Sequence, residues 1–340
     1  MKLADFVAGR YVRAAAFAVM ALVFGGAHAE TQQVRIGYQF GFQYIPILIV
    51  KHKQLLEKYA RQEGLDGIQV SWLQFSGGGN MNDALLSRNL DFGEVGVGPF
   101  IQLWAKTRGN YNVKAVAATG ITPMVLTSNN PAVKTLKDLG DGDRIALPAV
   151  KSSNQAIALQ MAVAKLWGDD DYQRLDKLTV SMKHPDGVAA MLTGKAGISA
   201  HFTVPPFSTQ ELAGPGVHEV LDSYEVYGEP GPVNVIYATG KFREDNPRVY
   251  RAFLAALTEA TRIAQDDRKF AGEVFIAETG SKMDPRLVEQ VLKDPKIRYT
   301  IVPSATLNLA RFMKKVGIIA EAPTSWKDMF FPEVHGEPGS

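Results

Sequence analysis

The stretch FSGGGNMNDALLSRNLDFGEVG, residues 75–96, sets three consecutive glycines before a short amphipathic segment and a strand of small residues. Two earlier segments, residues 34–40 and 68–75, are rich in β-branched residues, as strands are. Between them, residues 45–65 begin apolar and continue with the pattern of an amphipathic helix. Strands therefore alternate with helices, which predicts an α/β fold with a mostly parallel sheet flanked by helices.

A second block of the same kind begins near residue 130. Residues 135–149 predict a short helix, a turn and a strand, and residues 152–168 predict a helix. LLSRNLDFGEVGVGPF (85–100) aligns with MLTGKAGISAHFTVPPF (191–207), so that Pro99 matches Pro205. The alignment predicts two lobes built from the same supersecondary unit, although the common hydrophobic rhythm of α/β folds could also produce it.

The last third of the chain predicts a strand near residues 233–242 and then four long helices, at 247–264, 270–279, 285–293 and 306–316. We expect this part to return to the first lobe. The lobes are then discontinuous, with residues 30–123 and 234–340 in lobe 1 and residues 124–233 in lobe 2. Two crossover strands, near residues 123–127 and 233–237, would join them.

The first 29 residues have the features of a secretory signal peptide. Lys2, Arg10 and Arg13 precede an apolar run at 14–26, and Ala27-His28-Ala29 fits a cleavage site. A membrane anchor is the alternative, but the run is short for a bilayer and no stop-transfer segment follows. The chain has no cysteine to carry a lipid. We therefore expect a soluble periplasmic protein that is not a lipoprotein.

Composition excludes several functional classes. Loss of the signal removes three of the 37 basic and one of the 35 acidic residues, which leaves 34 of each. A formally neutral chain argues against nucleic-acid binding. The absence of cysteine argues against a thiol enzyme and a thiolate zinc site, and the histidines do not show the spacing of metal ligands. We expect neither a metal nor a cofactor.

Four blocks in this order carry a family resemblance, namely residues 36–46, 76–99, 136–155 and 191–202. They resemble the substrate-binding proteins of ABC importers for nitrate, taurine and aliphatic sulfonates, a group that includes binders of thiamine precursors. The resemblance implies a two-lobed type II periplasmic binding protein fold that closes on a small molecule. It also implies a monomer that delivers its ligand to transmembrane permease subunits, which work with a cytoplasmic ATPase.

The glycine triplet Gly77-Gly78-Gly79 does not fit a nucleotide motif. Asn80 and Met81 follow where a phosphate-binding loop needs Lys and Ser or Thr, and consecutive glycines do not have G-x-G-x-x-G spacing. The triplet instead predicts a turn that exposes backbone N–H groups at a helix N-terminus, which suits an anion. The alternative is that the glycines only permit a tight turn.

VKSSNQ, residues 150–155, predicts a matching helix N-terminus in the second lobe. Ser152, Ser153 and Asn154 supply N-cap chemistry, and Lys151 adds a positive charge, unless it is simply a solvated surface lysine. Two helix N-termini would then face one cleft from opposite lobes.

His201 and Phe202 lie at the end of the repeated strand, where the resemblance implies a ligand contact; His201 could equally be a buried core histidine. Many relatives have an acidic or tryptophan-containing strand end here, so the choice between sulfonate and nitrate stays open. Strand ends and crossovers add further candidates. The complete predicted ligand-binding set is Gln39, Phe42, Tyr44, Ser76, Gly77, Gly78, Gly98, Thr122, Lys151, Ser152, Ser153, Asn154, His201, Phe202 and Asn234.

These features predict a binding protein for a small organic anion or zwitterion, such as a taurine-like sulfonate or an aromatic carboxylate. One alternative is a binder of a pyrimidine thiamine precursor. A second is an enzyme like the pyrimidine synthases that share the fold, but those carry a cysteine-rich signature. Because this chain has no cysteine and no G-x-S-x-G pentapeptide, we predict no catalytic residues.

Overall fold

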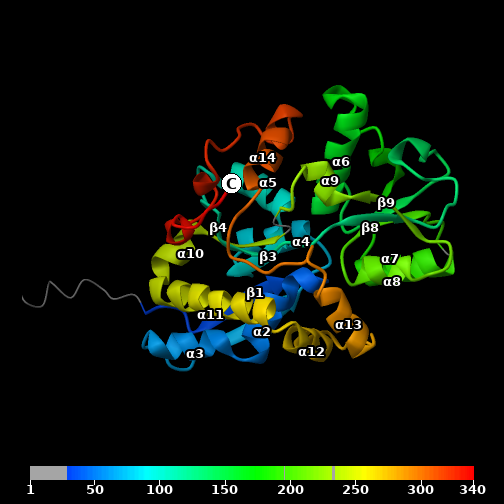
Figure 1. Ribbon diagram of the computed structural model, residues 1–340. Coiled ribbons are helices and arrows are strands. Elements are labelled where there is room, and N and C mark those ends of the chain that lie inside the picture. Colours follow the sequence, from blue (N-terminus) through cyan, green and yellow to red (C-terminus); the bar gives the residue numbers. More distant parts are fainter. Residues whose placement is uncertain (1–28, 195, 232–233) are drawn as a thin grey trace, which may run out of the picture.

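The computed structural model describes residues 29–194, 196–231 and 234–340, which form two lobes, each with its own five-stranded sheet (Figure 1). The predicted signal peptide, apart from Ala29, lies outside the described residues. So does Val233, which the sequence placed in the second crossover. Within the described ranges no helix is long and apolar enough to cross a membrane.

The sheet of the first lobe has the strand order β2-β1-β3-β10-β4. Strand β1 pairs in parallel with β2 and β3, as predicted, whereas β10 lies antiparallel between β3 and β4. The strands are β1 Gln33–Tyr38, β2 Gln69–Gln74, β3 Phe92–Gly96, β4 Lys114–Gly120 and β10 Asn234–Ala238.

Helices cover both faces of this sheet. The early ones are η1 Phe42–Tyr44, α2 Ile45–His52, α3 Leu55–Gln62, α4 Gly78–Leu86 and α5 Val97–Thr107. The predicted helix over 45–65 divides in two because Gln54 has a left-handed φ of 50°. The sequence predicted a turn at the glycine triplet; in the structure helix α4 already begins at Gly78, so that Gly78 and Gly79 belong to its first turn.

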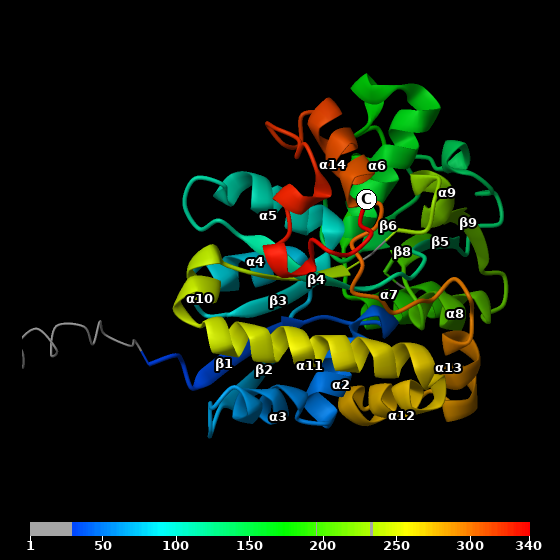
Figure 2. The ribbon, with the colours of Figure 1, turned by 60° about the vertical axis from the view of Figure 1, so that its left-hand side comes forward.

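The late helices follow strand β10 of the first-lobe sheet along the chain. They are α10 Gly240–Asp245, α11 Pro247–Asp266, α12 Arg268–Thr279, α13 Pro285–Leu292 and α14 Thr306–Lys315. The four predicted late helices are confirmed to within two residues at each end. Helix α11 packs along α2 and α3 (Figure 2). The ring of Phe253 on α11 stacks on Phe92 of β3 at 3.9 Å, which joins this helix to the core.

The second lobe repeats the plan, with strand order β7-β6-β8-β5-β9. Strand β6 pairs in parallel with β7 and β8, and the crossover strand β5 lies antiparallel between β8 and β9. Its elements are β5 Val125–Ser128, β6 Ile145–Leu147, β7 Thr179–Ser181, β8 Ala200–Thr203, β9 His218–Asp222, α6 Asn154–Trp167, α7 His184–Thr193, α8 Phe207–Leu212 and α9 Ser223–Tyr227.

The internal repeat is confirmed by the order of elements. The unit α4-β3-α5 in the first lobe corresponds to α7-β8-α8 in the second, and β3 and β8 each lie between a parallel strand and an antiparallel crossover strand. Because the carboxyl ends of parallel strands meet at one edge of a sheet, the loops after β1, β2, β3, β6 and β7 are the natural place for a site.

Candidate functional site

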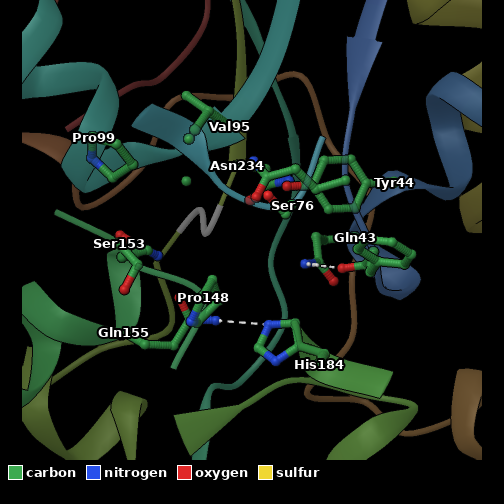
Figure 3. Close-up of a pocket in the computed structure, with 15 residues that line it drawn as sticks. Gln43, Tyr44, Ser76, Val95, Pro99, Pro148, Ser153, Gln155, His184 and Asn234 are labelled. Atoms are coloured by element: carbon green, nitrogen blue, oxygen red, sulfur yellow. Dashed lines mark hydrogen bonds between the residues drawn. The ribbon is translucent and has the colours of Figure 1, made fainter. Parts of the chain in front are cut away.

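A narrow cleft lies between the lobes at the carboxyl ends of the parallel strands, with a cavity volume of about 30 Å³. In Figure 3, Tyr44, Gln43 and Asn234 face Gln155 and His184 across it. The lining residues are Gln39, Phe40, Gln43, Tyr44, Ser76, Gly78, Val95, Gly96, Pro99, Pro148, Ser153, Asn154, Gln155, His184 and Asn234.

Among the described residues, four helices begin at this cleft, two from each lobe, apart from α2, which continues the 3-10 turn η1 after Tyr44. Helices α4 and α5 of the first lobe begin at Gly78 and just after Gly96, and helices α6 and α7 of the second begin just after Ser153 and at His184. Each helix N-terminus carries roughly half a positive charge and N–H groups that have no partner within the helix. The cleft is therefore electropositive without a cationic side chain.

The described residues that line the cleft include no Lys, Arg, Asp or Glu. Their polar groups are amides, hydroxyls and one imidazole. Such a set offers hydrogen-bond donors to an anion, but no carboxylate to pair with a cation. Helix N-termini supply positive potential without a buried lysine or arginine, whose charge would have to lose its water of hydration.

Glycines let the two lobes approach one another. A Cβ added to Gly96 would lie 2.6 Å from Cβ of Asn154, and one added to Gly98 would lie 2.6 Å from Cδ1 of Ile157, both in the second lobe. The N–H of Gly98 also donates to Oδ1 of Asn154 at 3.0 Å. Gly78 is different, because its added Cβ would meet Val95 at 2.5 Å within its own lobe.

Beneath the cleft lies the carboxyl of Glu94 on β3, which is completely buried. Its Oε1 accepts hydrogen bonds from Thr119 at 2.7 Å and Asn234 at 3.2 Å, and Oε2 has no partner among the described atoms. Burial raises the pKa of Glu94 to about 8, because those two bonds only partly offset the loss of solvation. Glu94 is therefore an uncharged acid at neutral pH.

The second-lobe side of the cleft carries His184, which is buried at the start of α7. Its Nε2 lies 3.2 Å from Nε2 of Gln155, the contact drawn in Figure 3. Burial and the neighbouring His201 hold the pKa of His184 well below its usual value, so the ring is neutral.

An apolar cavity of about 170 Å³ adjoins the cleft and shares Gln39 and Phe40 with it. Its remaining described lining is Gly41, Leu48, Gln74, Pro185, Pro206, Phe207, Gln210, Phe275, Thr279, Ser281 and Met283, again drawn from both lobes. A cavity of about 150 Å³ can hold benzene, so a six-membered ring fits this volume. Larger hollows of about 570 and 620 Å³ exist, but their described linings come from the first lobe alone.

Seven of the predicted ligand-binding residues line the cleft: Gln39, Tyr44, Ser76, Gly78, Ser153, Asn154 and Asn234. Gly77 and Gly98 lie beside the cleft, because a Cβ added to either glycine would lie within 4 Å of an atom of the second lobe. That these residues contact ligand stays a prediction.

The structure places the other predicted residues away from the cleft lining. Phe42 packs edge-on against Phe275 in the core, and Phe202 is buried in the second lobe. His201 is fully buried behind His184, which matches the alternative interpretation of this residue as a core histidine. Thr122 is buried, Lys151 is exposed and Ser152 is half-buried in the loop before α6.

Sequence reasoning missed Gln155 and His184, together with Phe40, Gln43, Val95, Gly96, Pro99 and Pro148. His184 had a usable signal, because it opens a helix directly after strand β7. The strand-end rule that selected Gln39 would have selected it too. Among the described residues no group of three or more potential ligands is placed to hold a metal ion.

The fold is that of two-lobed periplasmic binding proteins. The alkanesulfonate-binding protein SsuA of Xanthomonas axonopodis pv. citri, solved with bound MOPS, superposes with a TM-score of 0.68 at 20% identity, over 86% of this chain and 96% of that one. The nitrate-binding protein NrtA of Synechocystis gives a TM-score of 0.59 at 15% identity, over 78% and 70%.

A protein of Escherichia coli K12 that is named as an aliphatic sulfonates-binding protein is 25% identical over 251 residues, which cover 72% of this chain and 70% of that protein. The NMT1-like family matches residues 27–277, a span that includes every lining residue of the cleft. The chain belongs to the NMT1-like family.

Proposed function

We propose that this protein is the solute-binding component of an ABC importer, and that it captures a small organic anion in the interlobe cleft and delivers it to a membrane permease. The observation that carries the proposal is the convergence of four helix N-termini, two from each lobe, on one cleft without acidic side chains in its described lining. An anion bound there would hold both lobes together. The relatives named for sulfonates and nitrate support the same ligand chemistry.

The adjoining apolar cavity favours an organic anion over an inorganic one. Nitrate would occupy the polar cleft alone, whereas an aryl or alkyl group could extend past Gln39 and Phe40 into the space beside Phe207 and Phe275. Burial of that group adds roughly 25 cal/mol for each Å² of apolar surface removed from water. We therefore propose a sulfonate or carboxylate with an apolar substituent.

Benzenesulfonate is expected to bind at least tenfold more tightly than methanesulfonate, because only the former fills the apolar cavity. Calorimetry with both anions, nitrate, taurine, benzoate and an aminopyrimidine measures the order. Gln210→Trp, which fills the cavity, should remove the advantage of benzenesulfonate and leave methanesulfonate unchanged, while Gln210→Ala should keep it. Preferential binding of nitrate, or binding of the pyrimidine alone, would contradict the proposal.

We also propose that the protein acts in the periplasm after removal of residues 1–29. In a Gram-negative host, protein recovered by osmotic shock should begin near Glu30, because Ala27-His28-Ala29 fits the cleavage site. N-terminal sequencing of that fraction provides the check. A cytosolic chain that retained Met1 would be the opposite result.

A further inference from the structure

A chain of buried polar side chains runs from the interior of the second lobe to the cleft. Oε1 of Glu211 on α8 lies 2.6 Å from Nδ1 of His201 on β8. Nε2 of His201 lies 3.1 Å from Nδ1 of His184, and Nε2 of His184 lies 3.2 Å from the side-chain amide of Gln155. We refer to Glu211, His201 and His184 as the relay, and both His184 and Gln155 line the cleft.

The surroundings of the relay fix its geometry. The hydroxyl of Thr127 donates to Oε2 of Glu211 at 2.6 Å, and Thr203 lies 3.0 Å from Nδ1 of His184. Helix α7 passes so close that a Cβ added to Gly187 would lie 2.4 Å from the His201 ring. The ring of His184 stacks on Phe207, which also lines the apolar cavity. None of the three relay residues can turn away without disturbing a neighbouring element.

Burial restricts how protons can be distributed along the relay. Glu211 and His201 are both completely buried, so a charge on the pair depends on hydrogen bonds, such as those that Thr127 and His201 make to the two oxygens of Glu211. His184 is neutral, because burial holds its pKa well below the usual value. Two arrangements then keep every contact hydrogen-bonded, and they differ by one proton on the Glu211–His201 pair.

With one proton on the pair, His201 is neutral, donates from Nδ1 to the Glu211 carboxylate, and accepts at Nε2 from Nδ1–H of His184. Nε2 of His184 is then an acceptor, and the Gln155 amide donates to it and turns its carbonyl oxygen toward the cleft. With a second proton, His201 is an imidazolium paired with the Glu211 carboxylate and donates to Nδ1 of His184. His184 then carries its proton on Nε2, as a donor.

We infer that the relay sets the polarity of the cleft: a proton taken from solvent onto the Glu211–His201 pair converts His184 and Gln155 from acceptors into donors, so that anion binding is coupled to proton uptake. His184 and Gln155 are the ligand-binding residues, and Glu211 and His201 position their protons. This inference rests on the proposed function for its ligand, but the switch itself exists without ligand.

Other ionisable groups near the relay are few among the described residues. Lys183, the N-cap of α7, and Asp186 on α7 flank His184 and are exposed. On β9, Glu219 is in register with Thr127 and is also exposed. Across the cleft, Glu94 lies beneath Asn234. The variant Glu94→Gln removes the titration of this carboxyl, so that the titration of the relay can be followed alone.

Nitrogen-15 spectra of selectively labelled histidine in the ligand-free protein test the switch directly. As the pH rises, the proton of His184 should move from Nε2 to Nδ1 with the same midpoint at which the Glu211–His201 pair loses its second proton. In Glu211→Gln, whose amide cannot balance an imidazolium, both changes should disappear, and Glu211→Asp should restore them. A His184 proton that stays on one nitrogen throughout would overturn the inference. If Glu211→Gln does not fold, the test is made on the natural protein alone: the inference requires that the two changes have the same midpoint.

Saturating benzenesulfonate should raise the shared midpoint by about one pH unit if the protonated form binds ten times more tightly, as linkage requires. Methanesulfonate and inorganic sulfate serve as parallel anions, so that the result does not depend on the apolar cavity. An anion that binds and leaves the midpoint unmoved would overturn the coupling. Failure of every organic anion to bind would instead contradict the proposed function, and the ligand-free spectra would still report on the switch.

Discussion

Gly96→Val is expected to reduce the affinity for benzenesulfonate by a hundredfold or more while leaving each lobe folded. Gly96 has φ −58° and ψ 148°, a conformation that any residue adopts, so its backbone does not require glycine. Glycine is required here because an added Cβ would lie only 2.6 Å from Cβ of Asn154 in the opposite lobe. Valine should therefore hold the lobes apart.

The size of the effect follows from the contacts that closure supplies. Donors of α6 and α7 reach the ligand only when the lobes meet, and each hydrogen bond to a charged group contributes about 1.5–3 kcal/mol. Loss of two such bonds corresponds to roughly a hundredfold to ten-thousandfold in dissociation constant. Calorimetry measures the affinity, and small-angle scattering measures closure: the natural protein should become more compact with ligand, and Gly96→Val should not.

Gly79→Val provides the matched control, since a Cβ at Gly79 meets nothing within 4 Å. Lys151→Ala is a second control, because Lys151 is exposed and is not part of the cleft lining. Both should bind within a few-fold of the natural protein. Wild-type affinity in Gly96→Val would show that the cleft binds without closure, and a large loss in Lys151→Ala would make that charge the anchor.

Glu94→Gln is expected to stabilise the protein by several kcal/mol at pH 8 and by much less at pH 5. Burial raises the pKa of Glu94 from 4.5 in an unfolded chain to about 8 in the folded one. Between these values the unfolded state releases the proton and the folded state keeps it, so the free energy of unfolding falls as pH rises. A shift of this size corresponds to about 4–5 kcal/mol in total, which glutamine removes because it does not ionise.

Urea denaturation of both proteins at pH 5, 6, 7 and 8 measures this difference. The amide oxygen that Glu94→Gln introduces can still accept from Thr119 and Asn234, so a uniform loss of stability is not expected. The exposed Glu244→Gln controls for the change in net charge and should leave the pH dependence unaltered. Equal pH dependence in Glu94→Gln and the natural protein would mean that Glu94 ionises normally in the folded state.

The local pattern of the sequence determined the elements and their order. Periodicity predicted the late helices to within two residues, and the alignment of 85–100 with 191–207 predicted the repeated unit around β3 and β8. The glycine triplet and the Ser153 cap were identified as helix N-termini. These features can be predicted from the sequence because side-chain periodicity and helix capping are determined by residues that are neighbours along the chain.

Only the tertiary structure showed which groups meet. Gly96 faces Asn154, Glu94 accepts from Asn234, and His184 lies between the cleft and His201, the histidine that the sequence offered either as a ligand contact or as a core residue. The sequence also predicted two helix N-termini at the cleft, where four converge. Gly96 and Asn154 are 58 positions apart in the sequence, and Glu94 and Asn234 are 140 positions apart. Contacts of this kind depend on how the sheets and lobes pack. A hydrophobic pattern specifies which face of an element is buried, but not which partner buries it.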